Sequence, residues 1–201
     1  MANLDAPFGF RPWGKTLRQN LYAVPTAPTI HICIGDLVWE DVTNVVSAKL
    51  GLGIAVYDAA VPTTTLGDAM LCLGAVTACF DEDMDPVQYI DAAEAGDGTV
   101  AGYVLVADHP YQQFLAQADA AITDANFELN YEVTSVALCQ PDTRTLISTM
   151  EINVSGANVT STIPIRLVRQ AFIEDDHNAA GCRYVCQINP LCHRYGAGTT
   201  I

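Results

Sequence analysis

Cysteine and histidine side chains are the residues of this chain best suited to nucleophilic or metal chemistry, and it has seven of the first and four of the second. Cys182, Cys186, Cys192 and His193 stand close together and are of the types that bind zinc. In an extended strand, however, Cys182 and Cys186 lie about 13 Å apart, too far to share one metal ion. We therefore predict no metal site. Cys182, Cys186 and Cys192 are either buried thiols or candidates for a disulfide, and the odd total leaves at least one thiol unpaired.

Catalytic motifs are missing from the sequence. There is no G-x-S-x-G, H-E-x-x-H, P-loop or G-x-G-x-x-G string. His31, His109 and His177 fall in an expected apolar strand or in expected turns. The acidic run from Asp81 to Asp85 lacks the spacing, the central glycine and the closing glutamate of a calcium-binding EF-hand loop. We therefore predict that the protein is not an enzyme and has no cofactor.

Charge is strongly acidic and unevenly placed, with a net value of −14. No lysine or arginine lies between Lys49 and Arg144. The other basic residues gather near the ends: Arg11, Lys15, Arg18, Arg166, Arg169, Arg183 and Arg194. Basic ends could grip a partner while an acidic middle faces solvent, although charge can also serve solubility alone. We expect no nucleic-acid partner, because phosphates need lysine and arginine to neutralise them.

Membrane and export signals are also missing. The longest apolar runs, such as Ala69 to Phe80, are too short and interrupted to cross a bilayer, so we expect no membrane partner. Residues 1–20 have no apolar stretch typical of a secretory signal. We therefore expect synthesis in a cytoplasm, where thiols stay reduced.

Short apolar segments separated by turn residues predict a mainly β fold. The central stretch, Gly102 to Asp119, is interpreted as two strands forming a paired element, with a bend at Asp108-His109-Pro110. Gly74 predicts a bulge or bend inside the strand 69–80. Further strands are expected at 21–24, 30–40, 127–138, 146–154, 163–172 and 183–188, with the third and fourth of these paired. Loops or turns are expected at 58–67, 81–99 and 174–178, and a short helical turn at 118–125.

The expected architecture is one compact β-barrel or β-sandwich body with extensions at both ends. Residues 21–190 would form the body, 1–20 an extended N-terminal arm and 191–201 a short C-terminal tail. The arm contains aromatic residues without any period, so they need a surface made elsewhere to bury them, on a neighbour or on the body.

Three segments carry a family resemblance. They are the opening string APFGFRP at 6–12, the string VADHPYQQFLAQ at 106–117, and the strand, acidic loop and strand between Ile163 and Asn189. In this order and spacing they resemble the small capsid decoration (cement) proteins of tailed bacteriophages. The chain departs from the family at His109, where an acidic residue is common, and in its number of cysteines.

The resemblance implies a structural virion protein on the outer capsid surface that bridges major capsid protein subunits. It implies a homo-oligomer, for which we expect a trimer, with a dimer as the alternative. On this hypothesis Phe8, Phe10 and Trp13 anchor the arm on the capsid, and Arg11, Lys15 and Arg18 pair with acidic capsid residues. The alternatives are a minor head-completion or tail protein of the same virion and, further away, a cysteine-dependent enzyme or a carbohydrate-binding module.

Overall fold

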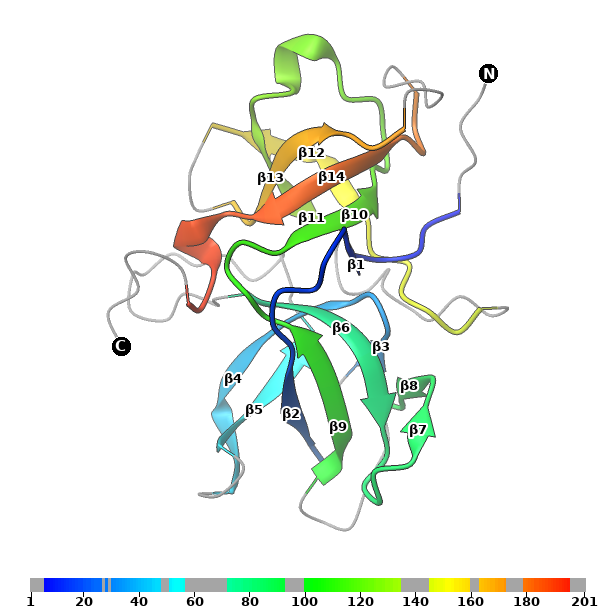
Figure 1. The fold of residues 1–201 in the computed structure, drawn as a ribbon, viewed down its shortest axis with the longest axis vertical. Coiled ribbons are helices and arrows are strands. Elements are labelled where there is room, and N and C mark those ends of the chain that lie inside the picture. The colour runs from blue at the N-terminus through cyan, green and yellow to red at the C-terminus, as the bar shows by residue number, and fades with distance from the viewer. Residues whose placement is uncertain are drawn as a thin grey trace.

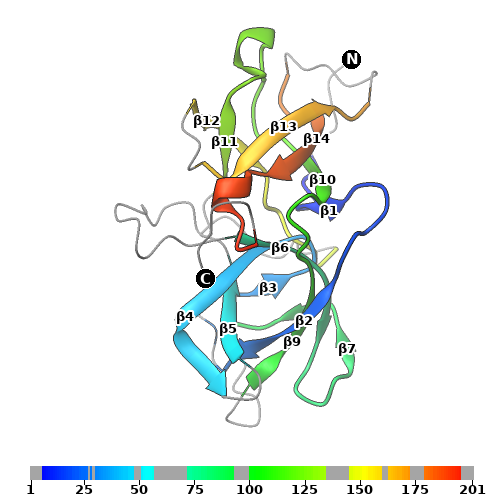
Figure 2. The ribbon, with the colours of Figure 1, turned by 60° about the vertical axis from the view of Figure 1, so that its left-hand side comes forward.

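Two antiparallel sheets, one above the other in Figure 1, make up the body. The computed structural model describes residues 6–26, 28, 30–47, 51–56, 72–92, 100–134, 145–159, 163–172 and 179–195. The lower sheet has the order β2 (Asn20–Pro25), β9 (Val100–Ala107), β6 (Cys72–Phe80), β4 (Leu37–Ser47) and β5 (Gly51–Val56). It curls into a half-barrel, so that its two edge strands, β2 and β5, lie close together (Figure 2). The mainly β prediction is confirmed.

The upper sheet contains the first strand and the C-terminal strands. Its order is β1 (Arg11–Pro12), β10 (Gln113–Gln117), β14 (Arg183–Ile188), β13 (Ile165–Gln170), β11 (Asn130–Val133) and β12 (Ile152–Asn158). The predicted strand 183–188 is confirmed, as are β13 within 163–172 and the pairing of β11 with β12.

Short elements complete the described part of the chain. β3 (Ile32–Cys33) pairs with β8 (Tyr89–Ile90), and β7 (Pro86–Val87) pairs with the end of β6. The segment predicted as one loop at 81–99 therefore contains two short strands, and its residues 93–99 lie outside the described residues. Single 3₁₀ turns occur at Asp124–Asn126, inside the predicted helical turn, and at Pro190–Cys192.

The central stretch forms two strands, as predicted, but they do not pair with each other. β9 bonds to β2 and β6, whereas β10 bonds to β1 and β14. Residues 108–112 carry the chain from the lower sheet to the upper one (Figure 1). Local alternation predicts the two faces of a strand but not its partners, which is why the paired interpretation was wrong.

Gly74 allows the lower sheet to pack tightly. A Cβ atom at this position would overlap the backbone oxygen of Ala107 on the neighbouring strand β9. Opposite it, the register of β4 against β6 shifts between Val38 and Trp39. The irregularity predicted at Gly74 is therefore present, and its cause is close backbone approach.

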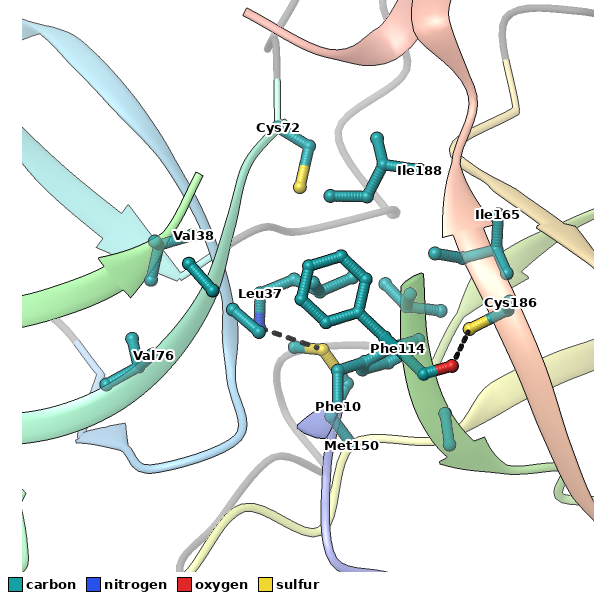
Figure 3. Close-up of a cluster of buried hydrophobic side chains, with 14 of the residues drawn as sticks. Phe10, Leu37, Val38, Cys72, Val76, Phe114, Met150, Ile165, Cys186 and Ile188 are labelled. Atoms are coloured by element: carbon teal, nitrogen blue, oxygen red, sulfur yellow. Dashed lines mark hydrogen bonds between the residues drawn. The ribbon is translucent and has the colours of Figure 1, made fainter. Parts of the chain in front are cut away.

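One continuous hydrophobic core lies between the two sheets. Figure 3 shows Val38 and Val76 from the lower sheet facing Phe114, Ile165 and Ile188 from the upper sheet. Phe10 enters between them from the N-terminal segment. Because both sheets bury their inner faces in the same cluster, neither is a separate folding unit in its present form.

Both expected extensions are at least partly packed on the body. Arg11 and Pro12 form a strand with Leu115 and Phe114, so residues 6–20 are not a free arm. At the other end, Cys192 and His193 are buried, and His193 bridges to Cys72. Residues 196–201, the predicted loops at 58–67 and 174–178 and the predicted link at 141–143 lie outside the described residues.

Candidate binding surface

Register across four strands brings arginines from distant parts of the chain onto one face. Arg11 on β1 pairs with Leu115, Leu115 pairs with Val185, and Val185 pairs with Arg169 on β13. Directly paired residues project to the same side of a sheet. The inner row next to this one is Pro12, Phe114, Cys186 and Leu167, three of which belong to the core. Arg11 and Arg169 therefore lie on the outer side of the upper sheet.

Two more arginines share this side. Arg183 is two residues from Val185 on β14, and Arg166 pairs with Gln187 on the same strand. Arg11, Arg166 and Arg169 are exposed, and Arg183 is half-buried. We call this surface the arginine face: Arg11, Arg166, Arg169 and Arg183, with Leu115 and Val185 between them.

The four strands that carry the arginine face contain no aspartate or glutamate. In a chain with 23 acidic and 9 basic residues, this is a marked local reversal of charge. Glu132, on the adjacent strand β11, is the first carboxylate beyond them in the sheet. The arginine face is therefore a cationic surface on an acidic protein.

Aromatic rings border the arginine face and hold three of its guanidinium groups. The Arg169 guanidinium lies over the Trp13 ring at 5.7 Å, and that of Arg183 over the Phe172 ring at 4.0 Å. The Trp13 and Phe172 rings meet edge to face at 6.0 Å. Arg11 lies over Phe8 at 5.1 Å. Stacking of this kind restrains an arginine while leaving its in-plane N–H groups directed outward.

Gln112 fixes the segment that carries Trp13 and Lys15. Its side-chain Oε1 accepts a hydrogen bond from the Leu17 N–H at 2.9 Å. Its Nε2 donates to the backbone oxygen of Gln113 at 2.8 Å and, at 3.5 Å, to that of Trp13. Gln112 is 1% exposed, so these bonds are sheltered from water. The loop 13–17 is thus tied to the start of β10 at both of its ends.

The predicted capsid-contact residues divide into two groups. Arg11 and Lys15 are exposed, and Phe8 and Trp13 are half-buried, so these four remain at the surface. Phe10 is 0% exposed and lies in the core, with its N–H donating to the Gly35 oxygen. The prediction that Phe10 contacts a capsid is therefore wrong, because its ring is used by the protein's own core.

Arg18 also has an internal role. Its Nε donates to Asp108 Oδ1 at 2.7 Å, and its guanidinium lies over the Tyr195 ring. Asp108 is 0% exposed and also accepts hydrogen bonds from Asn20 and Tyr22. A buried carboxylate needs such a partner, so Arg18 is committed to Asp108 rather than to an acidic capsid residue. Burial, helped by the bond to Asp108, raises the pKa of Tyr22 well above its usual value.

The cysteines of the described residues are all free and buried: Cys33, Cys72, Cys79, Cys182, Cys186 and Cys192. The predicted disulfide among Cys182, Cys186 and Cys192 is therefore not formed. Burial raises the pKa of Cys79 and of Cys192 to about 12 and raises that of Cys186 further. Thiols of this kind behave as small apolar side chains and not as nucleophiles.

Other polar groups build no metal or catalytic cluster among the described residues. No group of three histidine, cysteine, aspartate or glutamate side chains there is placed to hold a metal ion. Asp81 folds back on its own acidic run, since its Oδ1 accepts from the N–H groups of Asp83 and Asp85. An open pocket of about 420 Å³ near Tyr89 has Asp81 and Asp91 in its wall and belongs to the lower part of the molecule.

Comparison with family models, with curated proteins and with solved structures finds no match for this chain. No helix in the described part of the chain is long and apolar enough to span a membrane.

Sequence reasoning missed three residues of the surface as site residues: Arg166, Arg169 and Phe172. The grouping of cations near both chain ends was visible in the sequence. Only the pairing of β1 with β10, and of β14 with β10 and β13, brings those two ends onto one face.

Proposed function

We propose that this chain is a capsid decoration (cement) protein of a tailed bacteriophage. It lies on the outer surface of the virion and bridges major capsid protein subunits, and it does so as a homo-oligomer, most simply a trimer. The role is structural, with no chemical transformation of a ligand.

The arginine face with its aromatic border is the observation that carries this proposal. Phe8, Trp13 and Phe172 add rings to a broad cationic surface, and aromatic residues with arginine are the types enriched in protein interfaces. The surface lies on a sheet, outside any pocket, which suits a large flat partner. The ordered strings shared with decoration proteins at 6–12, 106–117 and 163–189 point the same way.

Reconstitution on shells tests this proposal. Shells assembled from the major capsid protein alone are mixed with the purified chain and sedimented. The expected result is saturable binding of wild type and loss of binding by the double variant Phe8→Ala, Trp13→Ala, which keeps its folded body. Leu191→Ala removes an exposed apolar side chain from the C-terminal 3₁₀ turn and serves as the matched control.

Two results would contradict the proposal. One is a wild-type chain that never binds the shells. The other is a double variant with unchanged occupancy, which would show that the N-terminal segment is not the contact. Binding confined to a single vertex would support the alternative of a head-completion protein.

A further inference from the structure

The arginine face offers several guanidinium groups at fixed separations. Arg11 and Arg169 lie on strands three positions apart in the sheet, which is about 14 Å. Arg166 and Arg169 are three residues apart on β13, about 10 Å. Both spacings exceed the size of one small anion, so a single phosphate or carboxylate cannot occupy the whole surface. The geometry calls for a partner with several separate negative groups.

Guanidinium chemistry narrows the kind of group. A guanidinium that is stacked on a ring presents two parallel N–H donors at its edge, which match the two oxygens of a carboxylate. Arg169 over Trp13 and Arg11 over Phe8 are held in this way. Leu115 and Val185 lie between the arginines, so the centre of the surface is apolar. A protein surface supplies both carboxylates and apolar contacts.

Overall charge separates an acidic protein from nucleic acid. A nucleic acid is a continuous polyanion, and it would meet the rest of this chain, whose net charge is −14. A folded protein with a local acidic patch meets only the arginine face. We propose that the arginine face binds a carboxylate-rich surface of a shell protein, with Arg11, Arg166 and Arg169 as its specificity-determining residues; this rests on the proposed function above.

The first experiment measures shell binding by cosedimentation at about 50 mM and about 500 mM salt. Wild type is expected to lose at least about tenfold in affinity at the higher salt. The variant Arg166→Ala, Arg169→Ala is expected to bind about tenfold more weakly at low salt and to depend less on salt. Arg194→Ala, which removes a cation outside the face, is expected to match wild type. Wild-type affinity in the double variant would overturn the inference.

A second experiment keeps the inference testable if wild type fails to bind shells, a failure that belongs to the proposed function. Poly-L-glutamate and duplex DNA are titrated separately at low salt, and Trp13 fluorescence reports on the edge of the face. The inference predicts binding of poly-L-glutamate by wild type, its loss in Arg166→Ala, Arg169→Ala, and weaker binding of DNA. Stronger binding of DNA, or no arginine-dependent binding of poly-L-glutamate, would overturn it.

Discussion

Two phenylalanines two residues apart have different roles in this protein. Phe10 is fully buried between the sheets, whereas Phe8 is half-buried beside Arg11. Replacing Phe10 by alanine leaves a cavity in the shared core and should cost about 3–5 kcal/mol of unfolding free energy. Phe8→Ala should cost less than about 1 kcal/mol, because that ring is partly in water.

Urea unfolding of the two single variants measures this difference. Equal losses of unfolding free energy would contradict the placement of Phe10 in the core and return it to the surface segment.

Asp36 is a buried carboxyl group with an incomplete set of partners. Its Oδ2 accepts from the Cys33 N–H at 2.7 Å, while Oδ1 has no hydrogen-bond partner. Burial raises the pKa of Asp36 to about 7, although hydrogen bonds from Ser148 and from the Cys33 backbone oppose the shift. The folded protein therefore keeps this proton over a pH range in which the unfolded chain has lost it.

This difference sets the sign of a pH effect. Between the unfolded pKa near 4 and the folded pKa near 7, the folded state binds more protons, so Asp36 lowers the unfolding free energy as pH rises. His193 acts in the opposite sense, because burial lowers its pKa to about 4. Asp36→Asn keeps an acceptor for Cys33 but cannot ionise. Relative to wild type, it should gain roughly 2–4 kcal/mol between pH 4 and pH 8.

Urea unfolding of wild type and Asp36→Asn across this pH range gives the difference directly and cancels the contribution of His193. A constant difference between the two proteins would show that Asp36 does not titrate in the folded state.

At the scale of elements, the segment 13–17 depends on one buried amide. Gln112 bonds to the backbone at Leu17 and Trp13, whereas its neighbour Gln113 contributes to the same region through its backbone oxygen. Gln112→Ala should therefore release the loop and speed trypsin cleavage after the exposed Lys15. The loss in unfolding free energy should be about 1–3 kcal/mol. Gln113→Ala is the matched control and should leave cleavage near the wild-type rate.

Hydrogen exchange at the Leu17 amide provides a second readout of the same loop. Equal acceleration in both variants would mean that Gln112 does not hold the segment.

Local sequence pattern predicted most of the strands because alternation and turn residues act over a few positions. β14 is an example: its inner residues Tyr184, Cys186 and Ile188 alternate with Arg183, Val185 and Gln187. Strand partners could not be predicted in this way. The row from Arg11 to Arg169 joins four strands distant in sequence, and no local period encodes that register. The burial of Phe10 and the pairing of Arg18 with Asp108 were missed for the same reason.

At the scale of the whole molecule, charge and sheet arrangement give the protein two unlike sides. The arginine face lies on the outer side of the upper sheet, and the exposed acidic turn around Asp83 lies beyond the β6 end of the lower sheet. A shell protein bound at the first side would leave the second directed away from it. Repetition over a symmetric shell multiplies a modest contact at each site.

Quantitative mass spectrometry of purified particles of the virus that encodes this chain tests the central claim most directly. The account predicts that the chain is present in a fixed ratio to the major capsid protein, at on the order of hundreds of copies per particle. Absence from the particles, or a copy number of about a dozen or fewer, as for a ring at one vertex, would contradict it.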